Sequence, residues 1–366
     1  MLGVSHAAAA TYDNLFVFGD STVDSGWWSG ALATPAQCAG VTAPCETSGQ
    51  TGPTFTGKDA LISHAIAAGG SPPANGAPVG AGNMNNVQLL AAKFGLTANP
   101  ANQPGGTNYA ISGALSAPVG SIGNLNPNTN LPSTMTQIAH YLSGGADPSA
   151  LYVISSGGND VTYANDNFTT LAAKEMFLSN QASALAGEIH TLQMDGAKSL
   201  VIYGLQGSGT LTTFMTNTLF SDLKTAGVNF LGIDIAGLIA AVQADPSKYD
   251  PNLTTTSLGV VGTSTGSACV TQTGAASTTT GWGQWCANTT TPSSSYAYLR
   301  STDSEQTNLF ADDQHLSAAG QQTEADFVFD QIMGTPVPAA LPLFATGLGA
   351  MGLLGWRRKR KAQAVA

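Results

Sequence analysis

Two polar motifs far apart in the chain contain the residue types that nucleophilic catalysis needs. Gly19-Asp20-Ser21 follows an apolar run, and Asp312-Asp313-Gln314-His315 lies close to the other end. A serine hydroxyl is a poor nucleophile until a nearby base removes its proton, which histidine can do near neutral pH. A carboxylate three residues before the histidine can fold back and hold the imidazole tautomer. The motifs predict a nucleophile at Ser21, a base at His315 and an acid at Asp312, with Asp313 as the alternative acid. Either motif alone could also be an ordinary turn.

Two segments between these motifs are rich in glycine and asparagine. Residues 107–114 read TNYAISGA, and residues 155–160 read SSGGND. Acyl transfer requires hydrogen-bond donors aimed at the developing oxyanion, and backbone N–H groups or an asparagine amide can supply them. Glycine allows the backbone to approach a substrate closely. Each segment could equally be a simple turn, so together they are candidates for an oxyanion site.

The elements that would position these residues are short apolar runs and one long helix. Strands are predicted at 14–19, 151–155, 199–203 and 228–235, and the helical spacing of apolar residues predicts a helix over 170–194. Strands that alternate with helices indicate βαβ units and a parallel sheet. Ligands bind at the carboxyl ends of such strands, which is where Ser21 and the GGND segment lie.

Two long segments, 30–108 and 251–300, are rich in Gly, Ser, Thr, Asn and Pro, and we expect them to be surface excursions rather than separate domains. Each contains one pair of cysteines. The even number and short separations favour local disulfides, although four cysteines allow three connectivities. The expected pairs are Cys38 with Cys45 and Cys269 with Cys286. The chain has no CxxC and its five histidines are scattered, so the sequence predicts no metal site.

Charge is scarce and unevenly distributed. Charged residues make up 9% of the chain, against roughly a quarter in ordinary soluble proteins. Five of the 12 basic residues lie together at 357–361, so the rest has 12 − 5 = 7 Lys and Arg against 22 Asp and Glu, a balance of −15. A body this acidic cannot neutralise phosphates, which excludes nucleic-acid binding.

The C-terminal segment predicts a membrane helix. Residues 339–356 are almost uninterruptedly apolar, about the shortest length that spans a bilayer, and the basic cluster RRKRK follows. That cluster should stay cytoplasmic, which places the acidic body outside. At the other end, MLGVSHAAAA resembles the small-residue end of a signal peptide, and we expect the export signal to lie upstream of Met1.

The tail PVPAALPLFATGLGAMGLLGWRRKRK resembles the PEP-CTERM sorting signals of Gram-negative bacteria in their VPxPA-like variant. In that family an exosortase removes the tail, and the protein passes to the surface or exopolysaccharide. The motif at 336–338 lacks the Glu of the commonest form. The resemblance implies an exported protein, anchored in the inner membrane facing the periplasm or, after processing, located at the cell surface.

The body resembles the GDSL esterase/lipase (SGNH hydrolase) family. Four blocks occur in the family's order, namely FGDSTVDSG, TNYAISGA, GGND and DDQH. The family's nucleophile falls on Ser21 and its acid and base on Asp312 and His315. Its oxyanion donors fall on the Ser21 amide, Gly113 and Asn159. The second block has ISGA where the subgroup often has two adjacent glycines, and Asp24 matches a subgroup position to which we assign a structural role.

The resemblance implies a flavodoxin-like three-layer α/β/α sandwich with a central parallel sheet, and ester hydrolysis through an acyl-serine without a cofactor. The expected organisation is a signal-peptide remnant at 1–10, the hydrolase domain at 11–335 and the sorting tail at 336–366. The expected substrate is a lipid, a short-chain ester or an acylated sugar. An O-deacetylase or acyltransferase acting on exopolysaccharide is the first alternative, and a non-catalytic surface or matrix protein is the second.

Overall fold

The computed structural model describes residues 12–25, 84–101, 104–125, 132–253, 266–270, 286–287, 290, 297–301, 303–311 and 315–334. Residues 12–328 form one compact unit, and residues 1–11 together with 329–366 form another. Of the second unit, only the helical residues 329–334 are described.

The larger unit is built on a four-stranded parallel sheet in the order β1-β4-β5-β6. Its strands are β1 (Leu15–Gly19), β4 (Leu151–Ser155), β5 (Ser199–Tyr203) and β6 (Leu231–Ile233). The register pairs Gly19 with Ser155, so β1 and β4 end at the same level. An α/β class with a central parallel sheet was predicted and is confirmed.

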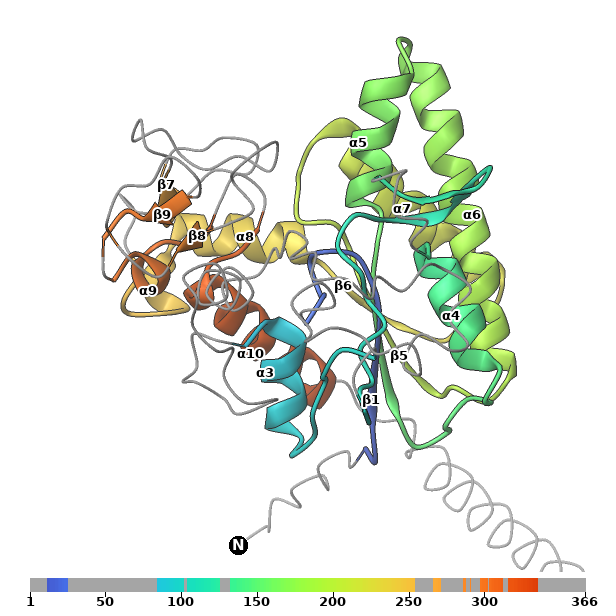
Figure 1. Ribbon diagram of the computed structural model, residues 1–366, viewed down its shortest axis with the longest axis horizontal. Helices are drawn as coiled ribbons and strands as arrows, with labels where there is room; N and C mark the ends of the chain where they lie inside the picture. Colours follow the sequence, from blue (N-terminus) through green and yellow to red (C-terminus); the bar gives the residue numbers. More distant parts are fainter. Residues whose placement is uncertain are drawn as a thin grey trace, which may run out of the picture. The chain divides into compact units, whose positions relative to one another are not determined.

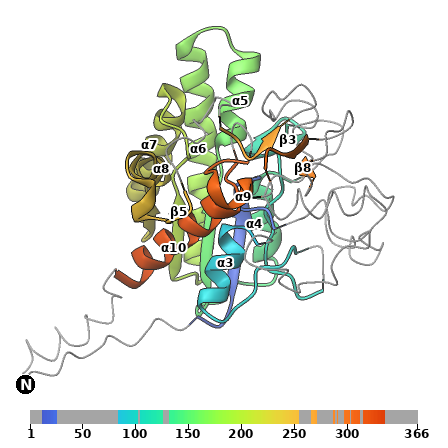
Figure 2. The ribbon, with the colours of Figure 1, turned by 90° about the vertical axis from the view of Figure 1, so that its left-hand side faces the viewer.

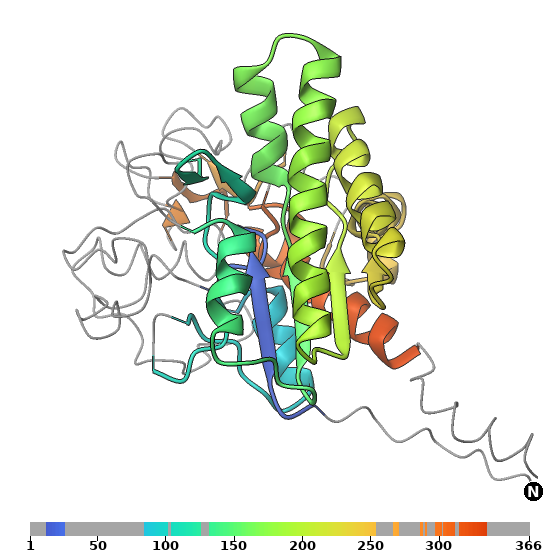
Figure 3. The same ribbon diagram turned by 90° about the vertical axis from the view of Figure 1, so that its right-hand side faces the viewer.

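Helices cover both faces of this sheet (Figure 1). Helices α4 (Thr134–Leu142), α6 (Leu171–Met194) and α7 (Thr210–Thr225) lie on the face seen in Figure 3. Helix α3 (Asn86–Lys93) and α10 (Ala318–Gly334), up to Val328, lie on the opposite face (Figure 2). Helix α5 (Gly158–Asn167) forms a hairpin with α6, and α8 (Ile235–Ala244) follows β6. The predicted helix at 170–194 is α6, with Thr170 as its N-cap.

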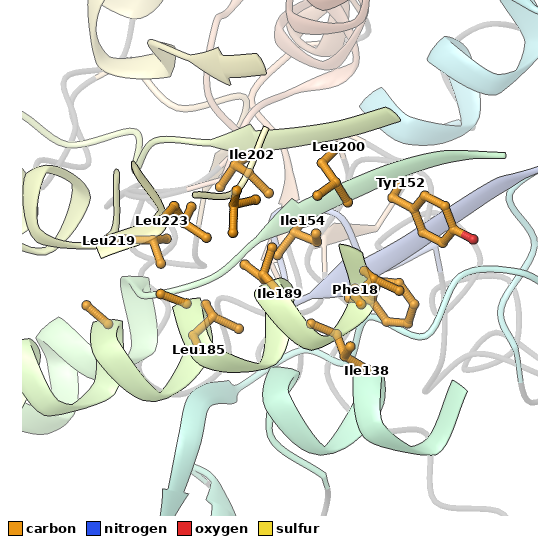
Figure 4. Packing of buried hydrophobic residues seen from close by; sticks show 14 of the residues in the cluster. Phe18, Ile138, Tyr152, Ile154, Leu185, Ile189, Leu200, Ile202, Leu219 and Leu223 are labelled. Atoms are coloured by element: carbon orange, nitrogen blue, oxygen red, sulfur yellow. The ribbon is translucent and has the colours of Figure 1, made fainter. Parts of the chain in front are cut away.

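The main core lies between the sheet and helices α4, α6 and α7. Phe18, Ile154 and Ile202 point from the strands toward Leu185 and Ile189 of α6 (Figure 4). All five are fully buried. Because successive side chains of a strand face opposite sides, the intervening valines of β1, β4 and β5 face α3 and α10. Each buried aliphatic side chain stabilises the fold by about 1.5–3 kcal/mol, so the strand ends that carry the site are firmly placed.

A further extended segment lies along the free edge of β1. Val17 N–H donates to Thr107 O (3.1 Å), Tyr109 N–H donates to Val17 O (2.8 Å), and Ile111 N–H donates to Gly19 O (3.0 Å). Asn108 forms a parallel bridge with Val17. Because Ile111 pairs with Gly19, the last residue of β1, this pairing carries the chain to Ser112 and Gly113 at the carboxyl end of the sheet.

The prediction for one of the two long segments is wrong in part. The segment 30–108 contains α3, whose residues from Asn86 to Ala91 are buried, so its last part belongs to the core rather than to a surface excursion. The segment 251–300 contributes β7 (Cys269–Val270), β8 (Cys286–Ala287) and β9 (Ala297–Leu299), which form a small sheet. The sequence predicts neither α3 nor β7 to β9, because each of these elements is short and lies in a polar stretch, where the spacing of apolar residues gives little signal. Strands β2 (Ala114–Val119) and β3 (Ile122–Asn124) form a separate antiparallel hairpin.

The strand predicted at 228–235 is shorter than expected. Strand β6 covers only Leu231–Ile233, because Asp234 already caps α8 through its hydrogen bond from Gly237 N (2.9 Å). The short helix α9 (Ser304–Thr307) and the 3-10 turn η2 (Pro246–Lys248) connect later elements.

Among the described residues, no helix combines the length and apolar character that a membrane crossing requires. The predicted membrane helix at 339–356 and the sorting tail lie outside the described residues, as do the residues of the N-terminal remnant.

Gly19 is the last residue of β1 and the first residue of GDSTVDS, residues 19–25, which we call the nucleophile motif. Its φ is +151°, and a Cβ there would lie 2.0 Å from Ser155 O. Gly19→Ala should lower the free energy of unfolding by at least about 3 kcal/mol, measured by urea denaturation. Gly95→Ala is the control, because Gly95 has a φ of +74° but open space around it. It should cost only about 1–2 kcal/mol. Equal losses would contradict the steric account.

Candidate active site

Ser21 and His315 meet at the carboxyl end of the sheet. Ser21 Oγ lies 3.0 Å from His315 Nε2, a hydrogen bond between residues 294 positions apart. Both residues are buried, with 9% and 5% of their surfaces exposed. A hydroxyl bonded to an imidazole nitrogen away from bulk water is the arrangement in which the imidazole can take the hydroxyl proton. The structure thus brings together the predicted nucleophile and the predicted base.

Asp20 fastens the nucleophile motif to the neighbouring GGND segment. Its backbone N–H donates to Ser155 O (3.1 Å), and its carboxylate accepts a hydrogen bond from the Gly157 backbone N–H. The same carboxylate accepts from Thr22 N (3.1 Å) and Thr22 Oγ1 (2.8 Å). Burial raises the pKa of Asp20, while these hydrogen bonds and the charge of His315 oppose that shift. Asp20 therefore links the turn after β1, which contains Ser21, to the turn after β4, which leads to Asn159 at the start of α5.

Asp24 fastens the nucleophile motif to the ISGA segment on its other side. Asp24 Oδ2 accepts hydrogen bonds from Ser112 N (2.8 Å) and Ser112 Oγ (2.8 Å), and the carboxylate is buried. Gly113 follows Ser112 with a φ of +87°, a conformation that glycine adopts without steric cost. These contacts agree with the structural role assigned to Asp24.

Asn159 lies beside the segment that contains Gly113. Its amide Nδ2 donates to Ala114 O at 3.0 Å, which uses one of the two N–H bonds of the amide and fixes its plane. Asn159 is partly exposed at the start of α5, directly after the turn at Gly157. The three segments that carry the predicted oxyanion donors are thus held together through Asp20, Asp24 and Asn159.

Asp160, next to Asn159, is a third buried carboxyl group in this region. It is fully buried and accepts hydrogen bonds from Ser116 N (3.0 Å) and Ser116 Oγ (2.8 Å) of β2. Burial raises its pKa to about 7, the bonds from Ser116 oppose the shift, and the charge of Asp20 adds to it. Ser116 Oγ also contacts Ser156 Oγ at 3.1 Å, so hydroxyl groups continue the network under the GGND turn.

The loop that carries His315 is pinned at both ends. Ala311 N–H donates to His315 O (2.7 Å), and Phe310 forms a bridge with Leu316. Behind it, Cys269 N–H donates to Ala311 O (3.0 Å), so the small sheet supports this loop. Asp312 and Asp313, the two candidate acids, lie outside the described residues.

Cys269 is disulfide-bonded, and its pairing with Cys286 stays a prediction. Cys38 and Cys45 lie outside the described residues. Within the part of the chain that the structure describes, no group of three or more His, Cys, Asp or Glu side chains could hold a metal ion.

Sequence reasoning missed the clamping roles of Asp20 and Asp160. Both lie within the sequence motifs, directly beside Ser21 and Asn159. The available signal was the scarcity of charge: in a chain with 9% charged residues, a carboxylate beside an apolar strand end is a candidate for burial with specific partners.

The pH dependence of stability tests the burial of Asp160. A carboxyl group whose pKa is raised in the folded state stabilises the fold at low pH. For Asp160 this contribution disappears as the pH rises from 3.8, the ordinary pKa of the group, through about 7, its pKa in the folded protein. Asp160→Asn keeps the shape without the titration. Wild type should therefore lose stability relative to the variant over this range, by a few kcal/mol, in urea denaturation at successive pH values. Parallel curves for the two proteins would contradict the raised pKa.

Comparison with known proteins agrees with this geometry. The family model described as GDSL-like lipase/acylhydrolase matches residues 15–328. A Pseudomonas putida protein, described as an uncharacterized protein in the trpE-trpG intergenic region, is 25% identical over 359 residues. The alignment covers 90% of this chain and 50% of that protein, so the chain spans about half the length of the relative it matches. Because the family model covers both Ser21 and His315 and most of the chain, this protein belongs to the GDSL-like lipase/acylhydrolase family.

Proposed function

We propose that this protein is a serine hydrolase that cleaves carboxylic esters through an acyl-serine intermediate. The observation that carries the proposal is the 3.0 Å hydrogen bond between Ser21 Oγ and His315 Nε2. The order of the motifs and the membership of an acylhydrolase family support it.

In the proposed reaction, His315 Nε2 takes the proton of Ser21 Oγ as the oxygen attacks the ester carbonyl. The Ser21 amide, the Gly113 amide and the second N–H of Asn159 stabilise the tetrahedral oxyanion. His315 then gives its proton to the leaving alcohol and afterwards takes one from the water that cleaves the acyl-serine. Asp312 orients the imidazole in this scheme.

The substrate we propose is a lipid, a short-chain ester or an acylated sugar. An O-deacetylase or acyltransferase acting on exopolysaccharide would use the same groups, and the sorting-signal pattern of the tail favours it as the alternative. A panel of short-chain esters, long-chain lipids and acetylated sugars separates these substrate classes. A purely structural surface protein would hydrolyse none of them.

We also propose that the protein is exported and held in the inner membrane by residues 339–356 or, after exosortase processing, located at the cell surface. The apolar run followed by RRKRK supports this topology. Fractionation of cells that produce the protein tests it, and a cytoplasmic location would contradict it.

Substitution of the nucleophile tests the proposed chemistry. Ser21→Ala should lower kcat/KM on p-nitrophenyl acetate by at least about 1,000-fold, because the acyl-enzyme can no longer form. Ser25→Ala is a matched control in the same loop, since its buried hydroxyl has no hydrogen-bond partner among the described residues. It should keep wild-type activity. Hydrolysis by Ser21→Ala at the wild-type rate would contradict the proposal.

The pH–rate profile tests the role of His315. A base must be neutral to accept a proton, so kcat/KM should rise with pH through the ordinary range of a histidine, around 6.5, and then level off. The profile is measured with a neutral ester at constant ionic strength. A rate that is independent of pH between 5 and 8 would argue against a histidine base.

A further inference from the structure

Three buried asparagine side chains hold three successive carbonyl groups directly after the nucleophile. Asn86 Nδ2 donates to Thr22 O (3.2 Å), Asn108 Nδ2 to Val23 O (2.7 Å), and Asn85 Nδ2 to Asp24 O (2.9 Å). The three acceptors belong to one segment, residues 22–24, which we call the nucleophile loop. All three asparagines are fully buried.

Such contacts replace regular secondary structure in this loop. Residues 21–23 form a turn, and Val23 N–H donates to Asp20 O at 3.3 Å. Buried carbonyl groups without partners are costly, and a loop without a helix or sheet ladder must satisfy them through side chains. The asparagine amides therefore determine the path of the backbone that follows Ser21.

Asn86 is the most completely constrained of the three. Its Nδ2 donates both to Thr22 O and to Glu324 Oε1, and its Oδ1 accepts from Val87 N (2.6 Å). An amide whose two N–H bonds and whose oxygen are all engaged has a fixed orientation. Glu324 lies on α10 and is 1% exposed.

Asn86 also connects to the segment that carries the base. Its backbone N–H donates to Gln321 Oε1 (2.8 Å), and Gln321 Nε2 donates to Leu316 O (3.3 Å), next to His315. One residue is thus bonded to the neighbour of the nucleophile and, through Gln321, to the neighbour of the base. The segments of Ser21 and His315 are therefore connected twice: directly, by the 3.0 Å hydrogen bond between the two side chains, and indirectly, through Asn86 and Gln321.

Burial of Glu324 is costly, which requires an explanation. Desolvation raises its pKa to about 8, and the hydrogen bond from Asn86 opposes that shift. Its second oxygen, Oε2, has no hydrogen-bond partner among the described residues. An apolar side chain would fill the same space between α3 and α10 more favourably. Glu324 supplies what an apolar side chain cannot, namely an acceptor for Asn86.

We propose that Glu324, acting through Asn86, is a positioning residue that holds the nucleophile loop so that Ser21 faces His315. This role rests on the proposed esterase function and explains how Ser21 is held in position relative to His315. Loss of the acceptor would free Asn86 to rotate, release Thr22 O and leave substrate binding unchanged. The expected signature is a fall in kcat with little change in KM.

Kinetics of four variants test this positioning. Glu324→Met keeps the volume and removes the acceptor, and it should lower kcat on p-nitrophenyl acetate by about 10-fold or more, with KM within about twofold. Glu324→Gln keeps an acceptor oxygen and resembles the protonated acid, so it should restore kcat to within about threefold. Asn86→Ala should lower kcat as much as Glu324→Met does. The double variant that combines these two substitutions should have a kcat no lower than either single variant, because both remove the same contact.

Two controls separate positioning from general loss of stability. Thr323→Val changes the adjacent buried side chain, whose hydroxyl has no partner among the described residues, and should keep the wild-type kcat. Leu223→Ala removes a fully buried side chain of α7 and should lower the unfolding temperature while kcat is unchanged well below that temperature. A kcat for Glu324→Met equal to that of these controls, or additive losses in the double variant, would overturn the proposal.

Hydrogen exchange provides a readout that does not require turnover. Backbone amides of residues 20–25 should exchange faster in Glu324→Met than in wild type, Glu324→Gln or Thr323→Val, because the loop loses one of its anchors. Wild-type protein that hydrolyses no ester would defeat the proposed function, while the exchange result still decides the positioning role. Unchanged exchange in Glu324→Met would overturn it.

Discussion

The site depends on buried hydrogen bonds that the carboxylates of Asp20 and Asp24, on either side of Ser21, accept from neighbouring segments. Asp20 holds the segment that leads to Asn159, and Asp24 holds the segment that leads to Gly113. A parallel sheet alone places strand ends on one edge, but it does not fix the loops beyond them. The carboxylates do so, because each accepts several short hydrogen bonds from backbone and hydroxyl groups. The proposed oxyanion donors are in this way held in segments that are tied to the motif containing Ser21.

Such an arrangement also explains how a chain with few charges uses them. Asp20, Asp24, Asp160 and Glu324 are all buried, and burial raises the pKa of three of them. Buried acids cost stability unless they are paired or protonated. Each of them accepts a hydrogen bond from a segment distant in the sequence, namely Asp20 from Gly157, Asp24 from Ser112, Asp160 from Ser116 and Glu324 from Asn86. The loop that carries His315 is held differently, by the backbone hydrogen bond from Cys269 of the small sheet to Ala311.

Much of the fold and part of the site follow from the sequence, for identifiable reasons. The strands at 14–19, 151–155 and 199–203 are continuous apolar runs. Ser21 and His315 lie in motifs that occur along the chain in the order typical of the family. By contrast, the edge segment at 107–111 and helix α3 lie in polar surroundings, where periodicity gives little signal. The anchoring of Asn86 by Glu324 joins residues 238 positions apart, and side-chain amide contacts of that range leave no local pattern.

In the proposed mechanism Ser21 and His315 form a nucleophile–base pair, and Ser21 becomes acylated during turnover. The most direct test is acid quenching of the protein during hydrolysis of p-nitrophenyl acetate, followed by peptide mass spectrometry. We expect an acetyl group on the peptide that contains Ser21, at the position of its hydroxyl. Ester cleavage without any acetylation of Ser21, or with acetylation only at another residue, would contradict it.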